Sequence, residues 1–149
     1  WGVDTSCRWR DGGTFSGREL NDGERDLRSQ YARLLHIARD ERAISEGDFF
    51  DLMYANPHTE WFNPHRQYAF LRKYENELLL IAANFDESDT QVRLNIPSHA
   101  FDYFKLPEFN DVEGTDLLTD TTTSFTPSPE IPAMLNLPGY SGVIYKFIL

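Results

Sequence analysis

The stretch YAFLRKYENELLLIAANF, residues 68–85, decides the fold that we expect for this chain of 149 residues. Two runs rich in apolar and aromatic residues, 67–73 and 78–84, flank the short polar connection Tyr74-Glu75-Asn76-Glu77, in which asparagine tolerates a left-handed backbone. Two such runs joined so tightly are typical of an antiparallel hairpin. The sequence therefore predicts a fold built on antiparallel strands.

The second run of this hairpin is apolar on both faces, because residues 78–83 read LLLIAA without alternation. A strand that faces water on one side alternates apolar and polar residues, whereas a strand buried on both sides does not. We therefore expect the outer face of this sheet to be covered. The candidates are an amphipathic helix at 21–43 and a domain outside this chain.

Further short apolar stretches follow between turn residues up to residue 149, and all eight prolines lie beyond position 56. Regular alternation predicts one strand with Val92, Leu94 and Ile96 buried on one face, and Pro97 ends that strand. The same alternation predicts a last strand over 142–149. The other expected elements are a first strand at 49–54, a helical turn at 99–104, a loop at 105–114, and strands at 115–119 and 134–137. The fold class that we predict is mainly β, an antiparallel Greek-key-type β-sandwich of about seven or eight strands.

One amphipathic helix is expected before the strands, and residues 1–20, rich in Gly, Ser and charge, are interpreted as a loop. Asn21 and Glu24 have the spacing of a capping box, which predicts that the helix begins there and ends near Ala43. Its apolar residues fall on one stripe of a 3.6-residue period; they are Leu27, Tyr31, Leu34, Leu35 and Ala38. The stripe needs a partner surface.

Charge and composition exclude several classes of function. A net charge of −10 and a pI near 4.7 disfavour binding to nucleic acid or to anionic lipid. The longest aliphatic run, 78–83, is far shorter than a membrane span, so no membrane insertion is expected. The single cysteine, Cys7, cannot form an internal disulfide. No targeting peptide is recognisable in the residues that start with Trp1, and we expect the chain to be a piece of a longer protein.

The order of these segments resembles the end of α-amylase superfamily glycoside hydrolases. The resemblance rests on LRSQYARLLHIARDERAIS (27–45), GDFFDL (47–52), the hairpin 68–85 and GYSGVIYKF (139–147). Its most diagnostic residues are Arg72, Asn84, Phe85 and the step Gly47-Asp48-Phe49. WRDGGTFSG (9–17) also looks like the loop that follows the last barrel strand in bacterial members.

The resemblance implies a division of the chain and a partner for it. Residues 1–20 would be a loop from the end of the missing barrel, 21–46 the last helix of the (β/α)₈ barrel, and 47–149 the C-terminal β-sandwich. The family's nucleophilic aspartate, acid/base glutamate and third aspartate lie on barrel strands, and that barrel needs about 250 residues. No catalytic residue and no cofactor are therefore assigned to this chain, and its own catalytic barrel is the expected partner.

One loop, 58–67, carries a candidate binding site for an α-glucan such as starch or a maltooligosaccharide. Trp61 and Phe62 could stack on a pyranose ring while neighbouring polar groups bind its hydroxyls. Alternatively, both aromatics fill the edge of the sandwich or pack on the absent barrel. His58, Glu60 and His65 match no metal-ligand spacing, so no metal site is expected.

Three functions remain open on the sequence alone. The leading hypothesis is a non-catalytic accessory domain that stabilises the catalytic barrel. The alternative is a carbohydrate-binding module that acts through Trp61 and Phe62. The third, a self-standing enzyme, lacks any motif with a mechanism, since neither a G-x-S-x-G elbow nor a phosphate loop is present.

Overall fold

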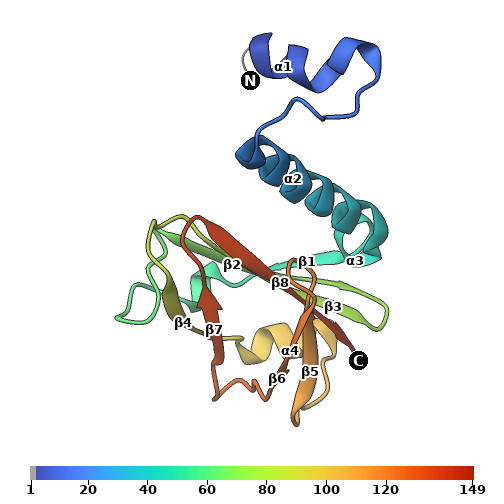
Figure 1. Cartoon of the computed structure of the whole chain (residues 1–149). Coiled ribbons are helices and arrows are strands. Elements are labelled where there is room, and N and C mark those ends of the chain that lie inside the picture. Colours follow the sequence, from blue (N-terminus) through green and yellow to red (C-terminus); the bar gives the residue numbers. More distant parts are fainter. Residues whose placement is uncertain (1–2) are drawn as a thin grey trace. The chain divides into compact units, whose positions relative to one another are not determined.

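The computed structural model describes residues 3–149, which fall into two compact units, one up to Ala38 and one from Arg39 to Leu149. The first unit is helical, and the second contains all the strands of the described chain (Figure 1). The two units are described separately.

The helical unit begins with a helix where a loop was expected. α1 (Val3–Arg10) and the short 3₁₀ helix η1 (Asp11–Gly13) occupy much of the segment 1–20, so that interpretation is wrong for residues 3–13. Asp4 in the first turn and Arg8 and Arg10 in the last turn complement the helix dipole, a signal that the glycine content obscured. Residues 14–20 are irregular, and residues 1–2 lie outside the described part.

The long helix α2 (Asp22–Asp40) begins as predicted, because its capping box forms. Asn21 Oδ1 accepts the N–H of Glu24 at 2.9 Å, and Glu24 Oε2 accepts the N–H of Asn21 at 3.0 Å. The apolar stripe of α2 is exposed to solvent at Leu27, Tyr31, Leu34 and Leu35. Among the described residues, no helix combines the length and the apolar character that a membrane span requires.

The predicted single helix to Ala43 is in fact two helices. α2 ends at Asp40, Glu41 is extended with φ −89° and ψ 110°, and α3 (Arg42–Ser45) follows as a separate turn. Within the second unit, α3 packs against β2 and β3.

The second unit contains eight strands that pair only antiparallel, as predicted. A six-stranded sheet has the order β1-β2-β3-β8-β5-β6, and β4 and β7 form a second, two-stranded sheet (Figure 1). The strands are β1 (Asp48–Asp51), β2 (Gln67–Tyr74), β3 (Glu77–Asn84), β4 (Thr90–Leu94), β5 (Val112–Asp116), β6 (Thr121–Phe125), β7 (Ala133–Leu137) and β8 (Ser141–Ile148). The pairing of β8 with β3 brings the end of the chain to the middle of the sheet.

Several boundaries differ from the prediction. The first strand ends at Asp51, and its expected continuation forms the 3₁₀ helix η2 (Met53–Ala55). β5 starts inside the expected loop 105–114, and the threonine-rich segment after it forms a further strand, β6. Threonine is β-branched and favours strands even where it is exposed. In the β2–β3 turn, Glu75 rather than the asparagine takes the left-handed conformation, with φ 50°.

The core lies between the two sheets, because side chains from both join one buried cluster. The expected helical turn is α4 (Ser98–Phe104), which adds Ala100 and Phe104 to that cluster. Val143, Tyr145 and Phe147, which alternate along the last strand, are all buried as predicted, but Ile144 on the opposite face is buried too, so the expected alternation of burial is only partly met. The largest fully buried apolar side chains are Leu52, Leu71, Leu79, Leu80, Val92, Leu94, Leu135 and Leu137.

Candidate functional site

The outer face of the six-stranded sheet carries an exposed apolar surface, which we call the outer patch and define as Phe49, Tyr68, Phe70 and Ile81. Phe49 is 47% exposed and Tyr68 is 40% exposed, although both lie in strands. The rings of Phe49 and Phe70 lie 5.4 Å apart, and those of Tyr68 and Phe70 lie 5.8 Å apart. The outer patch is therefore one continuous surface.

Strand register explains why these side chains share a face. Phe49 pairs with Arg72, and Phe70 pairs with Ile81, so that residues two apart on each strand project on the same side. The neighbouring Phe50 projects into the core instead and is 8% exposed. Large apolar residues that gather on a sheet face without burial are typical of an interaction surface.

Beside the outer patch, α3 is fixed on the same face by side-chain hydrogen bonds to its backbone. Arg72 donates from Nε to the carbonyl of Ala43 at 2.9 Å and from a terminal nitrogen to that of Ile44 at 2.6 Å. Glu77 Oε1 accepts the N–H of Ala43 at 2.7 Å, and Ala43 is fully buried. The doubly apolar strand β3 is thus partly covered by α3, while the rest of its outer face borders the outer patch.

Gly47 permits this close approach of α3. A Cβ atom at residue 47 would lie 2.4 Å from the carbonyl oxygen of Ala43 and 2.8 Å from that of Lys73. These distances are far below van der Waals contact, so a larger residue would push α3 from the sheet.

Lys146 completes the attachment by ion pairs with two carboxylates. Its ammonium group contacts Glu41 and lies 3.3 Å from Glu77. Burial lowers the pKa of Lys146, but the hydrogen bond with Glu41 and the charges of both carboxylates outweigh it, and the net pKa is raised.

The structure separates the two predicted glucan-binding residues. Phe62 belongs to the core and is 3% exposed, so its ring is not available for stacking. Trp61 is half-buried at the surface; its Nε1 donates to Glu60 at 2.8 Å, and the guanidinium of Arg93 lies 4.0 Å from its ring centre. The glucan hypothesis for this loop therefore depends on Trp61 alone.

Trp61 borders a polar cleft of about 240 Å³. The buried residues Gln67 and Asn84 link two segments that line the cleft. Gln67 Nε2 donates to Asn84 Oδ1 at 3.1 Å, and the Asn84 amide donates to the carbonyl of Ser88 at 2.9 Å. At the rim, Arg66 pairs with Asp86, whose pKa is lowered chiefly by the backbone N–H of Ser88, against the effect of burial. The lining residues are Thr59, Glu60, Trp61, Phe62, Asn63, Arg66, Gln67, Asp86, Ser88, Asp89 and Thr90.

The lining of the cleft offers hydrogen-bonding groups and charged side chains. Within residues 3–149, no three or more His, Cys, Asp or Glu side chains gather as metal ligands. His58, Glu60 and His65, weighed above as ligands, are all exposed.

The outer patch was not predicted from the sequence, although β2 carries a signal for it. Tyr68 and Phe70 alternate with the buried Ala69 and Leu71, so β2 is apolar on both faces, as β3 is. This second apolar series in residues 67–73 indicates the position of the patch.

No family model matches the sequence, and no curated protein sequence matches it either. Several solved structures, in contrast, match the fold of the chain. A maltogenic α-amylase, AmyB of Thermotoga neapolitana, matches 87% of this chain and 27% of its own, with a TM-score of 0.62 at 18% identity. The α-amylase of Geobacillus thermoleovorans matches 87% and 24%, with a TM-score of 0.60 at 19% identity. AmyP in complex with maltose matches 90% and 22%, with a TM-score of 0.62 at 16% identity.

These enzymes share with the chain a fold over most of its length, whereas the chain spans only about a quarter of theirs. The resemblance predicted from the hairpin and its flanking segments is thus confirmed at the level of the fold. The chain has the fold of a part of α-amylase family enzymes.

Proposed function

We propose that the chain is the C-terminal accessory part of an α-amylase-type glycoside hydrolase that acts on α-glucans. In this proposal it stabilises the catalytic barrel by packing the outer patch against it. α2 (Asp22–Asp40) supplies the last barrel helix, and catalysis belongs to the rest of the longer protein. The observation that carries the proposal is the exposed outer patch on a domain whose core is otherwise complete.

Two apolar surfaces support this assignment independently. In the second unit, residues 39–149, which we call the β unit, Phe49 and Tyr68 are about half exposed. In the helical unit, the stripe of α2 leaves Leu35 67% exposed. Burying the remaining half of one aromatic side chain contributes roughly 1 kcal/mol, so several such contacts add up to a substantial stabilisation. A last barrel helix would have this kind of stripe, because it packs on the barrel strands.

A matched pair of substitutions in the full-length enzyme tests the proposal. Phe49 on β1 and Met134 on β7 are 47% and 44% exposed, and they lie in different sheets. Phe49→Asp should lower the midpoint of thermal inactivation, because it places a charge in the interface, whereas Met134→Asp should leave the midpoint unchanged. Turnover of maltooligosaccharides at low temperature should be the same in both. Equal midpoints in the full-length enzyme would refute packing through the outer patch.

The second candidate is a glucan-binding surface at Trp61, which the polar cleft beside its ring favours. Affinity electrophoresis of the chain in amylopectin gels tests it. Trp61→Ala should then migrate faster than the wild type, while Phe85→Ala, which removes another exposed aromatic ring, should not. Equal migration of the wild type and Trp61→Ala would exclude binding there.

A further inference from the structure

We propose that Tyr54, His99 and Tyr103 form a surface subsite for one or two neutral pyranose units of an α-glucan. We call these three residues the tyrosine platform. The choice of α-glucan rests on the proposed function above, whereas the geometry of the platform does not.

The platform is assembled from two elements around one buried ring. Tyr54 lies in η2, and His99 and Tyr103 lie one turn apart on α4. Their ring centres lie 6.2, 5.5 and 5.7 Å from that of Phe50, respectively, and Phe50 is itself buried. Phe104, also buried, supports Tyr103 at 5.0 Å. The platform rings are therefore positioned by the core rather than by a mobile loop.

The platform presents ring faces and polar groups to solvent at the same time. Tyr54 is 61% exposed, Tyr103 is 52% exposed, and His99 is exposed as well. In the described part of the chain, no hydrogen bond engages either phenolic hydroxyl. Exposed rings with free polar groups provide a stacking face and hydrogen-bonding groups together.

These properties select a class of ligand. A pyranose has one face of C–H groups, which packs on an aromatic ring, and an edge of hydroxyls, which bind phenol and imidazole groups. The net charge of −10 disfavours anionic ligands such as nucleotides or sulfated sugars. A neutral sugar fits best.

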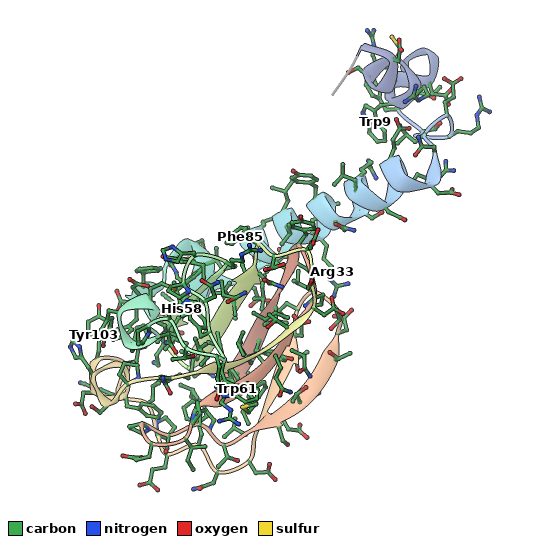
Figure 2. The ribbon with its side chains drawn as sticks, turned by 90° about the vertical axis from the view of Figure 1, so that its left-hand side faces the viewer. Trp9, Arg33, His58, Trp61, Phe85 and Tyr103 are labelled. Atoms are coloured by element: carbon green, nitrogen blue, oxygen red, sulfur yellow. The ribbon has the colours of Figure 1, made fainter. Side chains whose placement is uncertain are left out.

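The platform also lies away from both other candidate surfaces. Phe49 and Phe50 are consecutive on β1 and project to opposite faces, so the platform lies on the side away from the outer patch. A barrel that docks on the outer patch would therefore leave the tyrosine platform accessible to solvent. Figure 2 shows Tyr103 at the edge of the β unit, well separated from Trp61.

Affinity electrophoresis of the chain in amylopectin gels tests the platform, with Tyr54→Ala, Tyr103→Ala and Trp61→Ala compared in parallel. Tyr31 on α2 is 56% exposed and provides the control Tyr31→Ala. We expect Tyr54→Ala and Tyr103→Ala each to weaken binding about tenfold and Tyr31→Ala to leave it unchanged. Circular dichroism spectra establish that each variant keeps its fold.

Tyr103→Phe separates ring from hydroxyl, and it should keep most of the retardation if stacking dominates. Wild-type chain that migrates without retardation would overturn the platform, as would a loss confined to Trp61→Ala. Neither outcome bears on the thermal test of Phe49→Asp, so failure of the platform and failure of barrel packing are distinguishable.

Discussion

Arg72 of β2 holds the backbone of Ala43 in α3 through a hydrogen bond of 2.9 Å from its Nε. A second bond of 2.6 Å reaches the carbonyl of Ile44, so one guanidinium ties the start of the β unit to β2, the second strand of its six-stranded sheet.

Replacing Arg72 by methionine should therefore lower the free energy of unfolding by about 2–3 kcal/mol, because hydrogen bonds from a charged donor are lost and two carbonyls lose their partner. Urea denaturation measures the change. Arg39→Met, which removes an exposed arginine paired with Asp40, should cost no more than about 0.5 kcal/mol. Equal losses in the two variants would show that Arg72 does not attach α3.

Gly47→Ala should destabilise the β unit by about 2 kcal/mol or more, since its methyl group would overlap the carbonyl of Ala43 at 2.4 Å. Gly23→Ala is the matched control, because the nearest atom to a Cβ there is 3.6 Å away in the first turn of α2. That control should be neutral or slightly stabilising. Thermal midpoints followed by circular dichroism distinguish the two, and an unaffected Gly47→Ala would contradict the close approach.

Asn84→Ala should cost about 3 kcal/mol, because it leaves the buried amide of Gln67 and the carbonyls of Ser88 and Pro138 without their partner. Asn136→Ala removes an exposed amide that binds Gln91 and should change stability little. Chemical denaturation of both variants supplies the comparison. If the two midpoints coincide, the Asn84 network does not hold the walls of the Trp61 cleft.

Alkaline pH should weaken the attachment of α3. The pKa of Lys146 is raised above its ordinary 10.5 in the folded chain, so its stabilising effect is complete below that pH and is lost as the pH rises through the higher, folded-state pKa. Lys146→Met should accordingly be less stable than the wild type at neutral pH. That difference should shrink above about pH 10.5. A difference independent of pH would argue against the ion pairs with Glu41 and Glu77.

Local sequence signals predicted the elements that depend on local contacts. The capping box at Asn21 and Glu24 forms as expected, and the alternation in β4 matches the buried face of that strand. Such features depend on residues two to four positions apart, which a sequence displays directly.

Features that depend on tertiary contacts could not be predicted in this way. The break at Glu41 follows from the bonds that Arg72 and Glu77 make with α3, about thirty positions further along the chain. The irregular loop around Trp61 and Phe62 has no period, so nothing indicated which ring would be buried. The tyrosine platform joins η2 to α4, and only the fold brings them together.

The most direct test of barrel packing compares cysteine reactivity in the isolated chain and in the full-length enzyme. Tyr68→Cys reports on the outer patch and Tyr103→Cys on the platform, each with the exposed Cys7 replaced by serine. Both thiols should react readily with a soluble disulfide reagent in the isolated chain. In the full-length enzyme, the account predicts that the thiol at position 68 is protected while the thiol at position 103 still reacts. A thiol at position 68 that reacts equally fast in both proteins would contradict it.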